Sequence, residues 1–486
     1  MVFNSIAFFV FLPLVYLIFV LSPSGSRWAV LLAASLVFYA FLGQAVLLAA
    51  LATVICVSYA CGIWIENSPT EDRKRVFLYA GIALDVLLLA YLKYLPFVLE
   101  NLAALCGTLR LGVHVPSAGP LAFIGVSYFV FQAVSYLTDV YFGPQKAQRH
   151  FGLFSLYLAF FPKLLQGPIE RAESLFPQLE APFVFDYDAT RRGMLLFAWG
   201  FYKKVVVADR LAPFVQHVYG DVHGQWGLPY ILASYYYAFQ LYCDFSGYTD
   251  MALGVGLLFG FKLTPNFDAP YLSTSVAEFW RRWHMSFTSC IRDYVFDPLQ
   301  MTLRKWGRMS VFVSLLFAFT LVGLWHGASW GFIVWGALHG AFMVFSLLTK
   351  TWRSRLRRAL RLEGTAVLRL LQIFCTFNLV CFAEIFFRCA NLSDAWYMIS
   401  HLFQGLANPG LLGEIPDALY SGQAPSEFWL TLAALLLVPL VYFASKRVRL
   451  LEQSAALRWT AYYALALAIF FGGQFYAPKQ FIYFQF

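Results

Sequence analysis

The sequence is poor in charge. Asp, Glu, Lys and Arg make up 13% of its 486 residues and apolar side chains make up 60%, whereas about 25% of the residues in a typical soluble protein are charged. So few charges cannot cover a water-facing surface, and lipid must therefore solvate most of the chain. The composition excludes a disordered, a collagen-like or a nucleic-acid-binding protein.

Several familiar catalytic motifs are missing. The chain has no P-loop, HExxH or GxSxG, and Gly254, Gly256 and Gly260 lie in an apolar run that lacks the setting of a dinucleotide fingerprint. The eight cysteines form no CxxC pair and lie mostly inside apolar runs, so they are expected to be small buried hydrophobes. We predict no metal site, no bound cofactor and no energy-coupled chemistry.

The basic residues, which give a net charge of +9, are gathered in short clusters between apolar runs. This arrangement is typical of residues that fix membrane orientation, and it does not predict binding to nucleic acid. By the positive-inside rule the clusters share the cytoplasmic side. They are Arg73, Lys74 and Arg75; Lys146 and Arg149; Arg304, Lys305 and Arg308; Lys350, Arg353, Arg355, Arg357, Arg358 and Arg361; and Lys446, Arg447 and Arg449.

Apolar runs long enough to cross a bilayer, which takes about 20 residues, recur along the chain. They predict an all-α polytopic integral membrane protein with roughly 11 to 13 transmembrane helices, in one domain over residues 1–486. The expected spans lie near residues 5–21, 28–42, 45–65, 76–98, 119–142, 193–214, 229–262 (one crossing or a broken pair), 310–325, 330–349, 366–388, 427–444 and 456–472.

The connection over residues 390–428 carries four acidic residues and no Lys or Arg, so we expect it, and both termini, on the outer side. The first run has no basic residue before it and no small-residue cleavage site after it, and is interpreted as a signal anchor or a first span. Residues 153–165 are too short and too soon followed by Gly167 and Pro168 to cross, which favours a re-entrant or interfacial segment.

Two histidines stand at membrane depth. Residues 309–349 contain no Asp, Glu, Lys or Arg, yet they include His326 and His339. An ionisable group there is a functional hypothesis by default. His326 lies in GLWHGASWG, where Gly327 can interrupt the helix and Trp325 can line a pocket. The alternative is that the glycines of this region pack helices together and each histidine bonds a neighbouring helix; for His339 packing or support is favoured.

The segment AEFWRRWHMSFTSCIRDY, residues 277–294, resembles one amphipathic helix at the cytoplasmic interface, with an aromatic stripe that includes Trp283. His284 lies on the boundary of that stripe. A snorkelling interfacial helix explains the stripe but not the histidine.

Charges inside apolar runs should be paired, hydrated or near a helix end. Glu384 and Arg388 are spaced to pair on one helix face. Asp244 precedes Ser246 and Gly247, which favours a helix break that turns polar groups into a cavity.

Six ordered motifs resemble the membrane-bound O-acyltransferase family, and among its branches the bacterial alginate O-acetyltransferases. They are FFPKLLQGPIERA (160–172), GFYKKVVVADRLA (200–212), QLYCDFSGYTDMALG (240–254), FWRRWHMSF (279–287), GLWHGASWGFIVWGALHG (323–340) and FIYFQF (481–486). The resemblance implies helices around a thinned centre, where a cytoplasmic tunnel meets an outward funnel. It also implies that His326 is the essential histidine and that His284 occupies the second histidine-or-asparagine position.

These implications lead to an expected reaction. Acetyl-CoA enters from the cytoplasm, and His326 removes the proton of a hydroxyl from outside, since imidazole accepts a proton near neutral pH. The hydroxyl belongs to a periplasmic acetyl-carrier partner serving a polysaccharide, with direct transfer to sugar left open. The other residues expected to contact substrates are Trp325, Trp283, Asp244, Arg281 and Arg282.

The expected location is the bacterial inner membrane. Peptidoglycan, cellulose or teichoic acid are alternative acceptors, because those branches share the motifs. A transporter or channel is the rival class, since broken helices with intramembrane Asp and His suit it as well.

Overall fold

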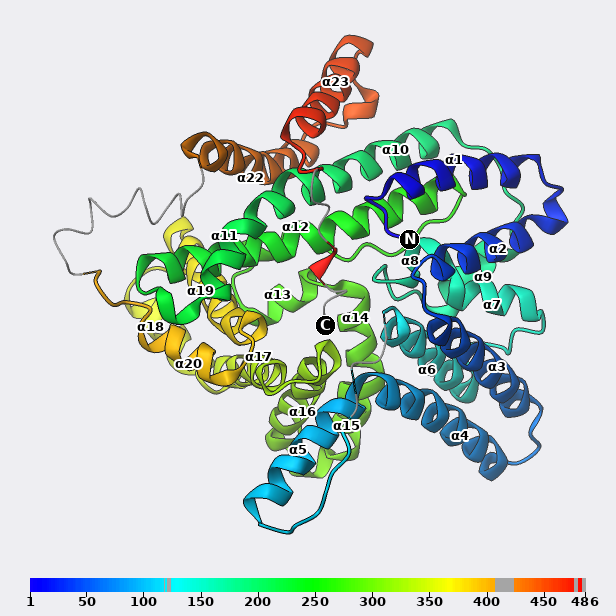
Figure 1. Ribbon diagram of the computed structural model, residues 1–486, viewed down its shortest axis with the longest axis horizontal. Coiled ribbons are helices and arrows are strands. Elements are labelled where there is room, and N and C mark those ends of the chain that lie inside the picture. The colour runs from blue at the N-terminus through cyan, green and yellow to red at the C-terminus, as the bar shows by residue number, and fades with distance from the viewer. Residues whose placement is uncertain (118, 120–123, 407–423, 476–479, 483–486) are drawn as a thin grey trace. The chain divides into compact units, whose positions relative to one another are not determined.

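The computed structural model describes residues 1–117, 119, 124–406, 424–475 and 480–482, and all regular elements in these residues are helical. Figure 1 shows them in chain order. The chain divides into two compact units: Met1–Phe197 with Met251–Pro265, and Ala198–Asp250 with Asn266–Phe486. The expectation of one domain over the whole chain stays a prediction.

Seven helical stretches of the described residues are long and apolar enough to cross a bilayer, and the protein is a multi-pass membrane protein. The apolar helix α1 (Ile6–Leu21) is shorter than these seven. The seven stretches are Ala45–Asn67, Glu71–Thr108, Arg308–His326, Trp330–Leu348, Ala366–Arg388, Pro425–Ser445 and Ala455–Gly472.

The first unit is built mainly from α1 to α9, and its helices α3, α4 and α6 pack on one another (Figure 1). Besides α1, the helices here are α2 (Arg27–Ala40), α3 (Ala45–Asn67), α4 (Glu71–Leu89), the π-helical η2 (Ala90–Tyr94), α5 (Leu95–Thr108), α6 (Val126–Phe142), α7 (Phe151–Ala159), α8 (Phe161–Leu164) and α9 (Ala172–Glu180).

The segment expected to be re-entrant forms α7 and α8, which are separated by Phe160. Residues 154–165 are buried by protein, as irregular backbone at membrane depth requires.

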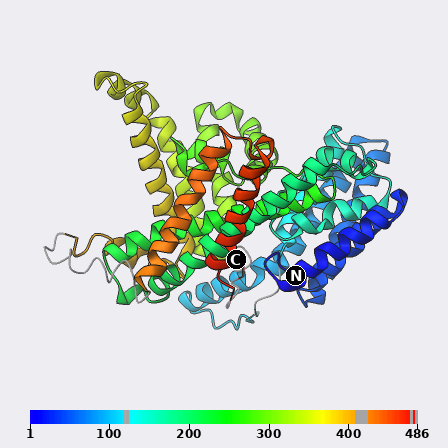
Figure 2. The same ribbon diagram turned by 90° about the horizontal axis from the view of Figure 1, so that it is seen from above.

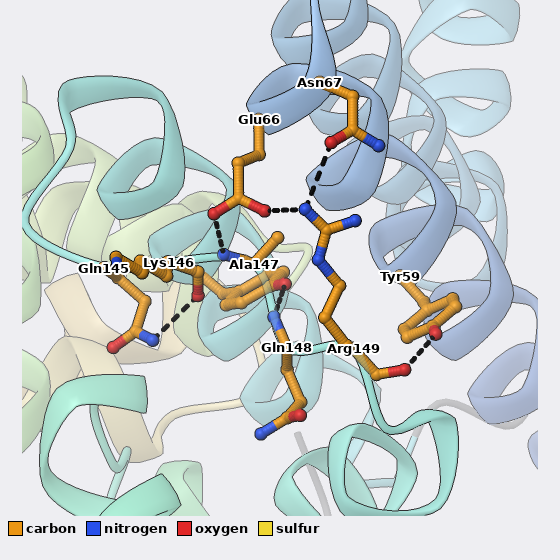
Figure 3. A network of polar contacts seen from close by, with 9 residues as sticks. Tyr59, Glu66, Asn67, Gln145, Lys146, Ala147, Gln148 and Arg149 are labelled. Carbon is orange, nitrogen blue, oxygen red and sulfur yellow. Dashed lines mark hydrogen bonds and ion pairs between the residues drawn. The ribbon is translucent and has the colours of Figure 1, made fainter.

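A polar network ties the connection before α7 to the end of α3 (Figure 3). The Arg149 guanidinium pairs with Glu66 and donates to Asn67 Oδ1 at 3.1 Å, while the Ala147 N–H donates to Glu66 Oε1 at 3.3 Å. The Tyr59 hydroxyl donates to the Arg149 carbonyl at 2.7 Å. These bonds fix the start of α7 against α3.

Two long helical stretches run from one unit into the other along the chain. The first consists of α10 (Tyr187–Tyr202), the π-helical η3 (Lys203–Ala208) and α11 (Asp209–Gly220). The second is α12 (Leu228–Leu258), one helix of 31 residues. It passes through Asp244 without interruption, so the expected break is wrong: Ser246 and Gly247 remain helical, and Gly247 instead lets the Gly200 carbonyl approach closely.

In the second unit α16 (Arg308–His326) and α17 (Trp330–Leu348) pack along each other, and α17 packs on α19 (Ala366–Arg388). Helices α22 (Pro425–Ser445) and α23 (Ala455–Gly472), orange and red in Figure 2, both pack on η3. The shorter elements are η5 (Pro270–Leu272), α13 (Val276–Arg282), α14 (Met285–Ile291), η6 (Arg292–Phe296), α15 (Asp297–Thr302), α18 (Lys350–Ala359) and α20 (Leu392–Ser400).

The ion pair predicted between Glu384 and Arg388 does not form. The Arg388 guanidinium donates to Gln216 Oε1 at 2.9 Å and lies over the Tyr219 and Tyr237 rings. The Glu384 carboxyl stays buried, and its Oε2 has no hydrogen-bond partner among the described residues. Aromatic faces on neighbouring helices compete for the guanidinium, which sequence spacing alone does not reveal.

Candidate functional site

His284 lies at a sharp break between α13 and α14. The single amphipathic helix predicted over residues 277–294 is therefore wrong: α13 ends at Arg282 and α14 begins at Met285. His284 has φ 45° and ψ 53°, a left-handed conformation that a non-glycine residue adopts only when its surroundings hold it there.

The preceding loop supplies that hold. The Asp268 N–H donates to the Arg282 carbonyl at 3.0 Å, and the Met285 N–H donates to the Asn266 carbonyl at 3.0 Å, so two backbone bonds bracket His284. The Asn266 side-chain oxygen accepts from both the Ser286 N–H and the Ser286 hydroxyl, at 3.1 and 2.6 Å. Asn266 thereby fixes the first turn of α14.

The imidazole of His284 is fully buried in an aromatic cage. Its centroid lies 4.7 Å from Phe245, 4.9 Å from Phe287, with the rings stacked, and 6.0 Å from Trp325. His284 lies outside the seven candidate spans, and burial lowers its pKa to about 3. The ring is therefore neutral near neutral pH, and its unprotonated nitrogen can accept a hydrogen bond.

His326 is the last residue of α16. The expected helix break is confirmed: Gly327 is extended and α17 resumes at Trp330, with the Phe332 N–H donating to the Ser329 hydroxyl at 3.5 Å. Gly327 has no room for a side chain, because a Cβ there would lie 2.0 Å from the Phe332 ring. His326 is 3% exposed, so its ring lies inside the protein at the end of α16.

Aromatic rings surround His326 as they surround His284. Its centroid lies 4.8 Å from Trp325, 4.9 Å from Trp335 and 5.3 Å from Phe387. Phe287 is stacked on Trp325 at 4.2 Å and also contacts His326 at 6.2 Å. The two histidines thus share Phe287 and Trp325 as neighbours, although 42 positions separate them in the sequence.

His339 supports the cluster from α17. Its Nδ1 accepts from the Trp280 indole N–H at 3.2 Å, a bond from α17 to α13. Trp335 lies 4.9 Å from His339 and 4.9 Å from His326, between the two imidazoles. This bond to a neighbouring helix is the arrangement that the packing interpretation of His339 anticipates.

Asp244 belongs to a buried ionic cluster. The Lys204 ammonium lies 2.8 Å from both Asp244 Oδ1 and Asp209 Oδ1. Asp244 Oδ2 accepts the Ile482 N–H at 2.9 Å, and Lys204 lies 4.5 Å from the centre of the Phe481 ring. The aspartate therefore holds part of the terminal motif FIYFQF against η3 and α12.

The remaining expected contact residues lie around the histidine break. Trp283 is buried and its ring lies 6.5 Å from Phe245, which also contacts His284. Arg281 is exposed, and Arg282 is half-buried with its guanidinium 2.8 Å from Glu278. The structure thus gathers His284, His326 and both tryptophans in one cluster and leaves the arginines at its edge.

Asn266 and Trp335 are the residues that sequence reasoning missed. The available signal for Asn266 was the stretch TPNFDAP, in which two polar residues lie between prolines after a long apolar helix.

Within the described residues there is no group of three or more His, Cys, Asp or Glu that could hold a metal ion.

Comparison with known proteins shows the family to which the chain belongs. Residues 126–383 match the sequence model of MBOAT, the membrane-bound O-acyltransferase family. The chain is 37% identical over 407 residues to the probable alginate O-acetylase of Azotobacter vinelandii, covering 83% of this chain and 78% of the relative.

Two further relatives act on other polymers by name. Identity is 31% over 429 residues with the peptidoglycan O-acetyltransferase of Helicobacter pylori, covering 81% of this chain and 78% of the relative. Identity is 29% over 282 residues with the teichoic acid D-alanyltransferase of Bacillus subtilis, covering 56% of this chain and 70% of the relative.

The fold and its buried histidine cluster belong to a multi-pass membrane protein of the acyl-transferring class. The chain is a member of the membrane-bound O-acyltransferase family, which makes it an acyltransferase.

Proposed function

We propose that the chain transfers an acetyl group from cytoplasmic acetyl-CoA to a hydroxyl on the outer side of the inner membrane, for O-acetylation of an alginate-like exopolysaccharide. The single observation that carries the proposal is the burial of two histidines, His284 and His326, around shared aromatic rings. They lie in a chain that is 37% identical to a probable alginate O-acetylase.

His326 acts as the general base in this proposal. It takes the proton of the acceptor hydroxyl, the hydroxyl oxygen attacks the thioester carbonyl, and the carbon–sulfur bond breaks to release coenzyme A, whose sulfur then takes up a proton. Because a thioester is already activated, proton removal and orientation supply most of the rate. His284 orients the thioester, with the rings of Trp325 and Trp283 beside it.

The donor enters from the side that carries the basic clusters. Arg281 and Arg282 are assigned to the same side. They lie at the end of α13, close to His284, where they can bind the phosphates of coenzyme A. Both termini lie on the opposite side. Asp244 contributes to substrate binding through the ionic cluster that it forms with Lys204.

The acceptor is a serine of a periplasmic acetyl-carrier partner, which passes the acetyl group to the polysaccharide. Direct transfer to a sugar is the alternative. The names of the relatives favour a polymer of the cell surface in each case, namely alginate, peptidoglycan or teichoic acid.

The experiment is a transfer assay without a gradient. The purified chain in detergent receives labelled acetyl-CoA and, in parallel, oligouronates, peptidoglycan fragments and a periplasmic protein fraction. We expect acetyl-CoA consumption that needs one of these acceptors and the His326 imidazole. A folded, monodisperse protein that consumes no acetyl-CoA with any acceptor contradicts the proposal.

A further inference from the structure

An apolar cavity of about 420 Å³ lies within the second unit, between α12, η5, α19 and α22. Six of the side chains that line it are Tyr242, Tyr271, Phe374, Phe377, Val438 and Tyr442. The cavity is many times larger than an acetyl group needs, and none of the residues assigned above to the reaction lines it.

The cavity lies at the membrane-facing side of the unit. Two of its walls are α19 and α22, both of which are long and apolar enough to span the bilayer. The α19 residues at its edge, Leu370 and Phe374, are 66% and 62% exposed. An apolar cavity bordered by lipid-facing side chains is accessible to the hydrocarbon chains of the bilayer.

The mouth of the cavity is polar and basic. The Tyr442 hydroxyl donates to Asp268 Oδ1 at 2.9 Å, and the Lys446 ammonium lies 3.6 Å from the same oxygen. Lys446 and the next residue, Arg447, are exposed one turn beyond the cavity wall, and Arg369 adjoins Leu370 on α19. One cation paired with that carboxylate and two further exposed cations, next in sequence to Lys446 and to the lining residue Leu370, favour an anionic headgroup over a neutral lipid.

We propose that this cavity binds one acyl chain of an anionic phospholipid, with the lipid phosphate at Lys446. The occupant is a bilayer lipid and not a substrate. The proposal is independent of the donor and acceptor proposed above.

The inner wall links the cavity to the histidine break. The rings of Tyr242 and Tyr271 lie 6.3 and 6.1 Å from Trp283, the residue before His284. An acyl chain packed against the two tyrosines restrains Trp283, so a bound lipid stabilises the backbone that presents His284.

The test is lipid retention measured by native mass spectrometry on protein extracted from membranes, followed by titration with phosphatidylglycerol and phosphatidylcholine. We expect one retained phosphatidylglycerol on the unmodified chain. Val438→Trp fills the cavity and loses this lipid, whereas the matched control Leu436→Trp, 53% exposed on the same helix and outside the cavity lining, keeps it.

A second pair of variants tests the headgroup without filling the cavity. Lys446→Gln lowers the preference for phosphatidylglycerol over phosphatidylcholine about fivefold. Arg449→Gln, which removes an exposed charge paired with Glu452, leaves the preference unchanged.

The proposal is overturned if the unmodified chain retains no lipid, or if Val438→Trp and Leu436→Trp retain it equally. If Val438→Trp does not fold, an unchanged preference in Lys446→Gln overturns it. A further outcome also contradicts the proposal: a long-chain acyl-CoA displaces the lipid and is then turned over. The cavity would then bind the acyl donor and not a bilayer lipid. Lipid mass is read without enzymatic turnover, so failure of the proposed reaction leaves this result interpretable.

Discussion

At the scale of single residues, the candidate site depends on one backbone conformation. His284 adopts its left-handed geometry because Asn266 and Asp268 bond the residues on either side of it. The side chain of Asn266 adds two bonds to Ser286 and is itself fully buried. Asn266 is therefore a positioning residue for His284.

Asn266→Ala should lower kcat at least tenfold and change KM little, because the Ser286 N–H then loses its acceptor and the turn that carries His284 relaxes. A buried unsatisfied donor costs about 1–3 kcal/mol, so the Tm should fall too. The measurement is steady-state kinetics together with thermal unfolding.

The control for this variant is Asn378→Ala. It removes an amide that accepts from Tyr235 and donates to the Phe374 carbonyl on α19, outside the histidine break. Equal losses of kcat in both variants would show that Asn266 has no particular role.

Trp280→Phe should lower stability and leave the turnover of folded protein near that of the unmodified chain. The substitution removes the indole N–H that donates to His339 but keeps the aromatic packing, and a hydrogen bond of this kind contributes about 0.5–1.5 kcal/mol. Thermal unfolding and kcat measured on the same preparation distinguish a structural role of the bond from a role in the reaction. A large loss of kcat without loss of Tm would assign His339 a part in the reaction.

The sequence singled out His326 and His339 as candidates, since histidines in a 41-residue stretch without other charges are conspicuous, and the structure buries both. Their roles in the reaction stay predictions. The sequence could not reveal the cage around the histidines. Phe245, Phe287 and Phe387 come from three different helices, and aromatic residues are so common in this chain that none stood out.

At the scale of elements, glycines allow α16 and α17 to approach closely. A Cβ on Gly336 would lie 2.2 Å from the Phe319 carbonyl oxygen, and a Cβ on Gly323 would lie 2.2 Å from the Phe332 carbonyl oxygen. The packing role expected for these glycines is confirmed. Close backbone approach of this kind is how membrane helices associate without a hydrophobic driving force between them.

Gly336→Ala should therefore destabilise the protein by several degrees in Tm, since backbone atoms on α16 must move to admit the methyl group. Gly107→Ala is the matched control, because this glycine is also helical and a Cβ there meets nothing within 4 Å. The control should be neutral or slightly stabilising, as expected for alanine in a helix. An equal Tm for the two variants would refute the packing argument.

The errors in the sequence-based elements share one physical cause, namely contacts with residues that are distant in the sequence. Hydrophobic periodicity over residues 277–294 is the same on both sides of His284, so it cannot reveal that Asn266 and Asp268 pull the chain out of the helix there. In the same way Ser246 and Gly247 suggested a break, but both serve contacts of α12 with other elements: Ser246 accepts from the Lys203 ammonium on η3 at 2.9 Å, and Gly247 lets the Gly200 carbonyl on α10 approach closely.

At the scale of the whole molecule, membrane topology is the property that the proposed direction of transfer requires. The basic helix α18 should face the cytoplasm, and the acidic connection that includes α20 should face outward. Single cysteines introduced at Arg355 and Asp394 in a cysteine-free background test this. A membrane-impermeant maleimide added to intact spheroplasts should label position 394 and spare position 355; the reverse pattern contradicts the direction.

The most direct test of the account is acetyl transfer in inside-out vesicles from cells that express the chain. Labelled acetyl-CoA is added to the exposed cytoplasmic face, and O-linked label is measured in the lumen. The unmodified chain should accumulate luminal label, and His326→Ala, inserted at the same level, should lower the rate about 10² to 10⁴-fold. Luminal label at the unmodified rate in His326→Ala would contradict the central claim.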